Sequence, residues 1–359
     1  MNNLSFDPNW VSPPGETMLD ILEEQNISLS TFADHMDTSI ESINSLIRGN
    51  TIINKSLALQ LEGFFGVSND FWLTREEQYR FICEKIQSEN INWLKQLPIK
   101  FMISNGWIGD VEDKVKACLD FFNVTSIKNW KTKYSSETHG LAFRTSQTLS
   151  SDESAVATWL RRGEIIAHSI QCKPWDKSLF ESSLDDLKKL SRNKNPKDFL
   201  PRLISKCAEF GVAVVIVPTP PGCRASGATK FISDDKALLL LSFRYLSDDQ
   251  FWFTFFHEAG HLILHQKTTH IEIQNGNVDE QEHEANAFAA EVLVPYTYHK
   301  ELINLRSNQR RLIKLAMELN IAPGIIVGQM QYLGIIGFNY LNSYKRKYNW
   351  EDINSVYYE

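Results

Sequence analysis

The sequence predicts a mostly α-helical protein with one small β-sheet, an α+β fold in three parts. Three observations predict it: short capped helices fill residues 10–80, amphipathic helical patterns continue through residues 81–198, and two short apolar runs precede a pair of helices in residues 199–348. With 359 residues, of which 43% are hydrophobic, the chain is long enough for two or three domains with buried cores. We therefore expect a helix-turn-helix bundle, a helical linking region and a third domain with the sheet.

The composition excludes several classes of protein. The five cysteines are scattered and form no CxxC pair, so neither a disulfide framework nor a cysteine zinc site is expected. The sequence has no signal-peptide pattern at its start and no run of about 18 apolar residues. We expect a cytoplasmic protein that does not contact a membrane.

Each predicted helix in the first part begins after a capping residue. Serine and asparagine side chains can accept a hydrogen bond from the free backbone N–H groups of the first helical turn. Gly49 and Gly66 then stop two of the helices. The helices and their caps are Leu29–Met36 after Ser28, Ile40–Arg48 after Ser39, and Lys55–Phe65 after Asn54. The spacing of the first two is typical of a helix-turn-helix.

Ile40, Ile43 and Ile47 are predicted to form the buried face of the second of these helices, while Arg48 faces outward with its polar neighbours. The stretch resembles the Xre-type helix-turn-helix of HigA-like antitoxins and phage repressors. The residues that carry the resemblance are Ile27-Ser28, Phe32-Ala33, Ser39 to Ser45, Arg48 to Asn50, Leu57 to Leu61 and Asp70 to Leu73. The resemblance implies that operator DNA binds through residues 28–55, that the helix enters the major groove, and that two copies pair on two half-sites. The residues expected at the DNA are Ser42, Asn44, Ser45 and Arg48.

Charge leaves a second role open for this segment. Residues 1–80 contain twelve acids and four bases, a balance of −8, whereas the rest of the chain has 33 bases and 32 acids. Phosphate neutralisation supplies much of the affinity for DNA, so a helix-turn-helix kept for dimerisation or partner docking is the alternative hypothesis. Asp37 stands at the turn where the family usually has glycine, and aspartate tolerates the left-handed conformation better than most residues. The only other basic cluster of note, Lys345–Lys347, is interpreted as a solvated surface, with nucleic acid as the lesser alternative.

The middle of the chain shows no catalytic spacing. Arg161 and Arg162 are interpreted as the solvated end of a helix, where cations suit the helix dipole, with a docking or interdomain contact as the alternative. The polar segment 191–198 is predicted to be a linker because it combines charge, asparagine and proline.

Two apolar runs rich in β-branched residues open the third part. They are Gly211–Val217 and Ala237–Phe243, and short apolar runs bounded by turn residues are typical of buried strands. Pro218–Gly222 and Ser233–Asp235 are predicted turns. A small sheet is therefore expected to precede the helix that follows.

That helix carries the chemistry. Ser247–Gln250 has the spacing of a capping box at its start, and the motif HEAGH follows at residues 257–261. Two histidines four residues apart lie on one helix face, so His257 and His261 can both bind one zinc ion at about 2 Å. Glu258 projects beside the metal, where it can accept a proton from the attacking water and pass it to the leaving amine.

A second predicted helix, residues 282–294, supplies a third ligand. Glu282 and Asn286 share one of its faces, so Glu282 is expected to bind zinc while Asn286 hydrogen-bonds a ligand from behind and fixes its orientation. The small residues Ala285 and Ala289 would let this helix pack close to the first.

Other polar residues nearby are expected to be less important. Glu284 points about 200° away from Glu282 around the helix, so it is the poorer ligand. His265 continues the four-residue spacing but lies about 6 Å beyond the other histidines along the axis, so we expect it to support the site without binding zinc. His270 and His283 are predicted to lie on a loop and a helix face, with no assigned role.

The two motifs together resemble the ImmA/IrrE family of zinc peptidases, which carry an HExxH helix followed by an E-x-x-A-N-x-F-A-A-x-x-x-x-P helix. Both motifs are present in full, and the resemblance runs from about Leu200 to Pro295 and is expected to extend to Tyr348. It implies that His257, His261 and Glu282 bind Zn²⁺ and that Glu258 is the general base. It also implies a substrate of the kind usual in that family, a partner repressor that is cut to release transcription.

Three hypotheses follow for the whole chain. The first is a zinc endopeptidase fused to a helix-turn-helix regulator, which cleaves a repressor or antitoxin-type protein. The second is a HigA-like antitoxin or transcriptional repressor whose C-terminal domain senses or binds a partner without cutting it. An intact Glu258 argues against the second, because a purely structural site needs no base beside the metal. The third is an interaction module whose acidic N-terminus mimics DNA or neutralises a basic toxin.

Overall fold

A computed structural model describes residues 12–142, 153–265, 269–273, 280–305 and 308–354. It confirms a mostly α-helical protein with a small β-sheet. The chain divides into two compact units, residues 1–95 and residues 96–359, and each is described by itself. The domain boundaries near residues 80 and 198 stay predictions, and the structure groups the middle helices with the sheet.

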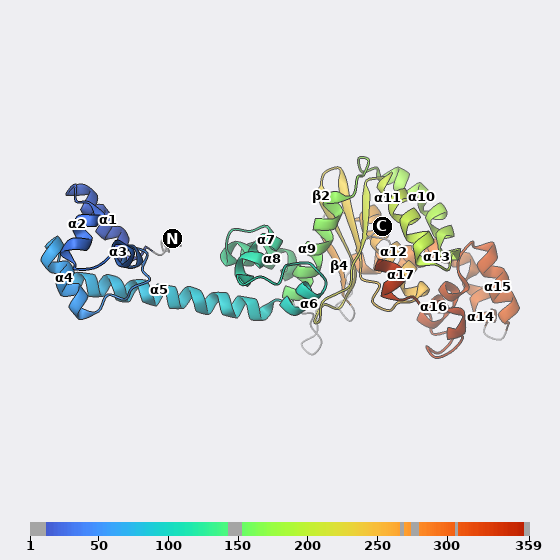
Figure 1. Cartoon of the computed structure of the whole chain (residues 1–359). Helices are drawn as coiled ribbons and strands as arrows, with labels where there is room; N and C mark the ends of the chain where they lie inside the picture. The colour runs from blue at the N-terminus through green and yellow to red at the C-terminus, as the bar shows by residue number, and fades with distance from the viewer. Residues whose placement is uncertain (1–11, 143–152, 266–268, 274–279, 306–307, 355–359) are drawn as a thin grey trace. The chain divides into compact units, whose positions relative to one another are not determined.

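The N-terminal unit is a bundle of helices (Figure 1, blue). Its capping predictions are confirmed: Ser28, Ser39 and Asn54 each accept a hydrogen bond from a backbone N–H three residues further on. Asp37 adopts the left-handed conformation expected of it, with a φ of 50°. The helices are α1 (Pro14–Glu24), α2 (Leu29–His35), α3 (Ile40–Ile47), α4 (Lys55–Phe65) and α5 (Asn69–Gln96), of which residues 69–95 belong to this unit.

The core of this unit forms around fully buried side chains such as Phe32, Leu61 and Trp72. The prediction that Ile40 is buried is wrong, since 45% of it is exposed. The buried set of α3 is Ile43, Leu46 and Ile47, an i, i+3, i+4 set that leaves out the first helical turn.

The second unit begins with helices and then builds the sheet. The elements before the sheet are α6 (Ile99–Ser104), α7 (Lys114–Phe122), α8 (Ile127–Ala142), α9 (Glu153–Ser169), α10 (Lys177–Lys189), η1 (Leu190–Arg192) and α11 (Pro196–Ala208). The strands are β1 (Val212–Ile216), β2 (Ala225–Ser233), β3 (Lys236–Leu241) and β4 (His270–Ile273), with α12 (Asp248–Leu264) between β3 and β4. After β4 follow α13 (Glu280–Leu293), η2 (Tyr296–Tyr298), α14 (His299–Asn304), α15 (Gln309–Glu318), α16 (Pro323–Tyr332), η4 (Asn342–Tyr344) and α17 (Trp350–Asn354).

The sheet has the strand order β1-β3-β2-β4. The strand β1 runs parallel to β3, while β2 is antiparallel to both β3 and β4. The two strands predicted from sequence are β1 and β3. The strands β2 and β4 were not predicted, because β2 mixes polar and apolar residues without clear alternation and β4 lies in a segment predicted to be a polar loop.

Helices cover both faces of the sheet, which explains why β1 and β3 are apolar throughout (Figure 1). On one face α9 approaches closely at Gly163, where a Cβ would lie 2.7 Å from the side chain of Leu240. On the other face, Leu239 and Leu241 join the core that includes α12. The sheet thus forms a rigid support directly behind α12.

The helix-end interpretation of Arg161 is wrong. Arg161 lies in the middle of α9, where it donates to the carbonyl of Phe121 at 2.8 Å and pairs with Glu164 at 3.0 Å. Lys230 of β2 completes this buried ion group at 2.7 Å from Glu164. This group joins α9 to α7 and to the sheet. The alternative prediction, a docking or interdomain contact, therefore describes Arg161 better.

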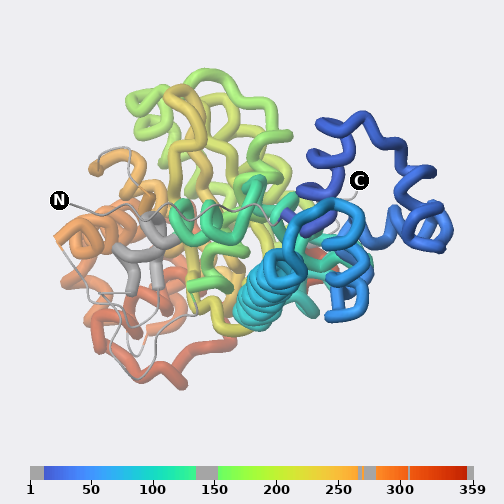
Figure 2. The backbone as a smooth tube through the Cα atoms, turned by 90° about the vertical axis from the view of Figure 1, so that its left-hand side faces the viewer, coloured from blue at the N-terminus to red at the C-terminus, as the bar shows by residue number. Residues whose placement is uncertain are grey.

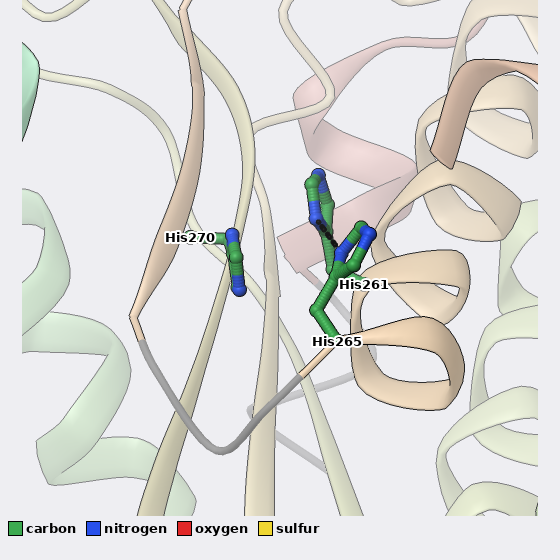
Figure 3. Close-up of side chains that lie close together, drawn as sticks. All are labelled: His261, His265 and His270. Carbon is green, nitrogen blue, oxygen red and sulfur yellow. Dashed lines mark hydrogen bonds between the residues drawn. The ribbon is translucent and has the colours of Figure 1, made fainter. Parts of the chain in front are cut away.

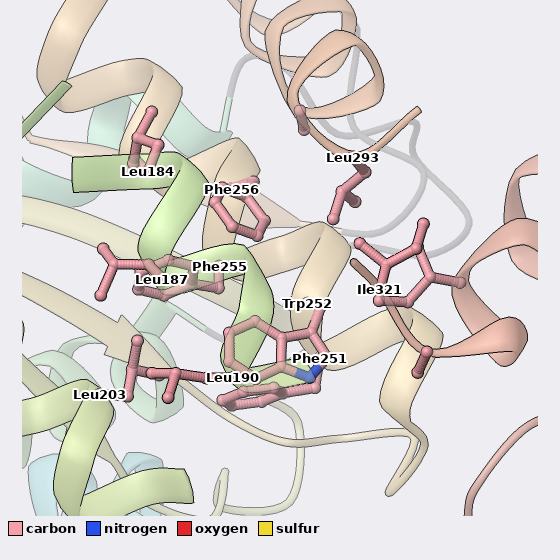
Figure 4. Packing of buried hydrophobic residues seen from close by; sticks show 14 of the residues in the cluster. Leu184, Leu187, Leu190, Leu203, Phe251, Trp252, Phe255, Phe256, Leu293 and Ile321 are labelled. Atoms are coloured by element: carbon pink, nitrogen blue, oxygen red, sulfur yellow. The ribbon is translucent and has the colours of Figure 1, made fainter. Parts of the chain in front are cut away.

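Large aromatic residues hold α12 in the core. Trp252, Phe255 and Phe256 are fully buried, and burying each contributes about 1.5–3 kcal/mol to folding. Leucines of α10 and α11 pack against them from one side, while Leu293 of α13 and Ile321 approach from the other (Figure 4). The helix is therefore surrounded along most of its length.

The predicted capping box at the start of α12 is wrong, although the helix begins where expected. Ser247 makes no capping hydrogen bond with its side chain. Instead, the backbone N–H of Asp248 donates to the carbonyl of Arg346 at 3.1 Å. The carboxylate of Asp248 accepts from the backbone N–H groups of Asp249 at 2.9 Å and Arg346 at 3.0 Å. A segment far along the chain thus replaces the local cap.

The interpretation of Lys345–Lys347 as a solvated surface is wrong for Lys345 and Arg346, whereas Lys347 is exposed as expected. Lys345 lies 2.6 Å from the carboxylate of Asp249, and only 12% of its side chain is exposed. The guanidinium of Arg346 donates to the backbone carbonyls of Ser191 and Asn193 at 2.8 and 2.9 Å. These cations are structural, since they join the tail to the start of α12 and to the end of η1.

The C-terminal helices lie below the light-green helices of the same unit in Figure 2, where they are orange to red. The helix α15 ends before Asn320, which has a φ of 57°, and Pro323 begins α16. No single helix in the described part of the chain has both the length and the apolar composition of a membrane span. The helices α15 and α16 meet these two criteria only when they are counted as one, and the chain bends by 110° between them.

Candidate metal centre

Three side chains from α12 and α13 converge on one point. The Nε2 atoms of His257 and His261 lie 3.0 Å apart, as their positions one helical turn from each other predict. The two carboxylate oxygens of Glu282 lie 3.2 and 3.4 Å from these nitrogen atoms. The imidazoles are fully buried, and 19% of the Glu282 side chain is exposed.

These distances fit a zinc ion. Ligand atoms placed about 2.0 Å from a common centre in a tetrahedron are about 3.3 Å from one another. The three separations of 3.0, 3.2 and 3.4 Å bracket this value. Two imidazoles and one carboxylate are also a usual donor set for a catalytic zinc site, which leaves a fourth position open.

Hydrogen bonds orient both imidazoles for this role. His257 Nδ1 lies 3.1 Å from Asn286 Oδ1, which can only accept, so the proton is on Nδ1 and the Nε2 lone pair faces the centre. His261 Nδ1 lies 2.9 Å from His265 Nδ1, and His265 Nε2 lies 3.0 Å from a carboxylate oxygen of Glu284. If His265 donates to Glu284 and accepts from His261, the Nε2 lone pair of His261 also faces the centre. Two lone pairs 3.0 Å apart repel each other, and a cation between them removes that repulsion.

The charge states agree with a metal centre. Burial raises the pKa of the Glu282 carboxyl, but the two neighbouring histidines outweigh burial, so its pKa lies well below the usual value. Burial also lowers the pKa of His261, and the contact with Glu282 offsets this only in part. The cluster therefore presents an ionised carboxylate and a neutral imidazole, as a zinc site requires.

The close approach of α12 and α13 brings these groups together. A Cβ on Gly260 would lie 3.3 Å from the Cα of Ala285 and 3.0 Å from the ring of Phe288. Ala285 and Ala289 are fully buried, in agreement with the small-residue face expected for α13. A glycine at 260 thus allows α13 to pack closely on α12.

Glu258 lies against the strand β2. Its side chain is fully buried, and a Cβ built on Gly227 would lie 2.4 Å from Glu258 Oε1 and 2.7 Å from its Cγ. Gly227 pairs with Leu241 on one side and Glu272 on the other. The sheet thus leaves room for the Glu258 carboxylate only because residue 227 has no side chain.

The HEAGH motif, the three candidate ligands and the sheet behind α12 all come from one continuous part of the chain. Residues 207–326 match the IrrE N-terminal-like domain, the family Peptidase_M78. The match supports a metallopeptidase of the ImmA/IrrE kind, which implies a metal that is typically zinc. A search of curated proteins found no match for the chain.

The IrrE N-terminal-like domain contains every residue predicted for the zinc site. The residues that the structure brings together are His257, His261, His265, Glu282 and Asn286, while Glu258 follows His257 on α12 and lies against Gly227. Glu284 contacts His265 and not the central imidazoles, in agreement with its expected position. The N-terminal bundle lies outside the matched range.

The assignment of His270 to a loop without a role is wrong. His270 lies on β4, and its ring stacks on that of His261 with centroids 4.4 Å apart and planes 17° apart (Figure 3). Nitrogen atoms of His261, His265 and His270 also lie within 4.8 Å of one another. Since lone pairs of stacked rings point along parallel planes and do not converge, we interpret His270 as packing on the ligand His261. A prediction of β4 would have been needed to find it.

The four residues predicted to contact DNA lie together on α3 and at its C-cap in the N-terminal unit. Ser42 and Arg48 are exposed, and Asn44 and Ser45 are half-buried. The hydroxyl of Ser45 accepts from Thr51 at 3.1 Å. Both exposed groups are thus accessible to a partner, while Ser45 also supports the following loop.

We predict that Glu282→Gln lowers the affinity for zinc about 100-fold or more, because it removes the only anionic ligand. Glu284→Gln is the matched control on the same helix and should change the affinity less than 10-fold, since Glu284 acts only through His265. Competition with a fluorescent zinc chelator measures both. The opposite order of the two variants would show that Glu284 is the ligand.

We predict that Gly227→Ala lowers peptide cleavage by about 100-fold while zinc stays bound, because the new methyl group displaces the Glu258 carboxylate without touching the ligands. Gly63→Ala in α4, where a Cβ meets no atom within 4 Å, serves as the control. Zinc content and cleavage of one peptide mixture are measured together. Full activity of Gly227→Ala would contradict the placement of Glu258 against β2.

Proposed function

We propose that the chain is a zinc-dependent endopeptidase that cleaves a partner protein. The convergence of His257, His261 and Glu282, with Glu258 as the residue after the first histidine, is the observation that carries the proposal. The match of residues 207–326 to the IrrE N-terminal-like domain supports it.

Each residue has a distinct role in peptide hydrolysis. Zinc bound by these three side chains would polarise the peptide carbonyl and make water a stronger nucleophile. Glu258 is buried against Gly227, and its proposed role is to accept a proton from water and give it to the leaving amine. Asn286 and His265 keep the two imidazoles in the tautomers that the reaction needs.

The proposed substrate is a repressor or antitoxin-type protein. The support comes from the resemblance to the ImmA/IrrE family and from the helical bundle that precedes the peptidase domain. Cleavage of such a protein would release transcription of the genes that it controls. A HigA-like antitoxin that binds a partner without cutting it is the alternative, and the placement of Glu258 favours cleavage, because binding alone does not require a buried carboxylate beside the ligands.

We further propose that the N-terminal bundle docks the peptidase to a protein partner. Its balance of −8 disfavours polyanions, and Arg48 is the only cation on the outward face of α3 and its C-cap. Operator binding through residues 28–55 is the competing outcome, which the resemblance to Xre-type proteins supports.

We predict that Glu258→Gln abolishes cleavage of the partner, with a loss of at least about 1,000-fold, and leaves zinc bound. Repressor proteins encoded close to this gene, and a random peptide mixture, are incubated with the wild type and the variant. The products are identified by mass spectrometry. Zinc is measured on the same samples. Undiminished cleavage by Glu258→Gln would refute the assigned base, while binding without any cleavage by the wild type would favour the antitoxin.

We predict that the bundle causes no sequence-specific shift of upstream DNA fragments, even at low salt, where phosphate contacts are strongest. If a shift is observed, Arg48→Ala should weaken it, and Lys95→Ala at the far end of α5 should not. A shift that Arg48→Ala weakens would contradict the docking proposal and indicate that the bundle binds operator DNA.

A further inference from the structure

A pocket of about 220 Å³ lies beside the metal cluster, between the first turns of α12 and the helices α13 and α16. Two residues join it to the cluster. Asn286, which holds His257, lines the pocket, and so does Phe253, whose ring lies nearly parallel to that of His257 with centroids 6.4 Å apart. The pocket therefore begins one helical turn before the first predicted zinc ligand.

Apolar atoms supply most of the exposed surface of the pocket, and the amides of Gln250, Asn286 and Gln329 also line it. Leu293 and Ile325 are buried and contribute aliphatic surface. The rings of Phe253 and Tyr332 lie 6.1 Å apart, and 64% of Tyr332 is exposed, which places it at the rim. A large aromatic residue with this exposure beside a cavity is well placed to cover an apolar group that enters.

The one carboxylate at the pocket is already neutralised. Asp249 is 4% exposed and lies 2.6 Å from Lys345. Gly328 of α16 lies against it, since a Cβ there would be 2.9 Å from both Asp249 Cβ and Oδ2. Asp249 thus offers no free charge to a side chain that enters the pocket.

We propose that this pocket receives an apolar side chain, aliphatic or aromatic, from the substrate residue next to the cleaved bond. The proposal rests on the peptidase function proposed above and names the specificity of that site. The volume is below the range of about 300–1,000 Å³ that is typical of whole small-molecule ligands, and it suits a single leucine, methionine or phenylalanine side chain. A substrate is selected because water leaves this apolar surface when the side chain enters.

A series of mercaptoacetyl amino-acid amides tests the proposal without knowledge of the natural substrate. The thiolate binds zinc, so each compound places one side chain beside the metal, and displacement of a fluorescent hydroxamate measures its affinity. The zinc-loaded full chain should bind the leucine and phenylalanine compounds about 10- to 100-fold more tightly than the alanine, aspartate and lysine compounds.

Two variants test whether the surface that selects the substrate side chain is this pocket. Tyr332→Ala removes the exposed ring at the rim and should reduce the preference for phenylalanine over alanine at least about 5-fold. Ile325→Phe fills the pocket and should reverse the order in favour of alanine. Tyr340→Ala, which removes another exposed ring from the loop after α16, is the control and should leave the preference unchanged.

The outcomes separate this proposal from the function on which it rests. A chain that retains no zinc and binds none of the thiols refutes the peptidase function, and the proposal with it. A chain that retains zinc and binds all side chains equally, or prefers lysine, refutes only the apolar pocket. An apolar preference that Tyr332→Ala and a folded Ile325→Phe both leave unchanged would place the selecting surface elsewhere and overturn the proposal.

Discussion

The close packing of α12 on α13 is the constraint on which the candidate site depends. The separation of these helices at Gly260 and Ala285 sets the distance from the Glu282 carboxylate to the two imidazoles, because all three ligands lie within about one turn of that contact. The sheet and α10 support α12 from behind, and the C-terminal helices surround its other side. The fold around the helix pair therefore acts mainly to keep one interhelical distance fixed.

Much of the cluster could be predicted because its geometry is local. A spacing of four residues on a helix determines that His257 and His261 face the same point, and the same rule places Asn286 beside Glu282. Short apolar runs likewise identified β1 and β3, since a strand covered by helices on both faces has few alternatives to a continuous apolar sequence. In the N-terminal unit, serine and asparagine caps identified the helix starts for the same local reason.

The features that could not be predicted depend on residues far apart in the chain. The strand β2 is recognisable only through the strands that pair with it. The contact of Gly227 with Glu258 depends on this strand, so it could not be predicted either. His270 lies beside the metal cluster because β4, which contains it, pairs with β2, and the ring of His270 stacks on that of His261. Arg161 and Lys345 looked like surface cations because distant groups become their neighbours only in the fold. These groups are the Phe121 carbonyl and Lys230 around Arg161 and Glu164, and Asp249 beside Lys345. Composition within a short window contains no information on such pairs.

The contact of Arg346 with Asp248 has a consequence for the order in which the protein is made. The two residues are 98 positions apart, and the later one supplies the N–H that the carboxylate at the start of α12 accepts. On the ribosome, the motif helix emerges long before its final hydrogen-bond partner, so its first turn cannot be completed until residue 346 has been synthesised. The tail therefore completes the start of α12 only after the rest of this unit has been synthesised.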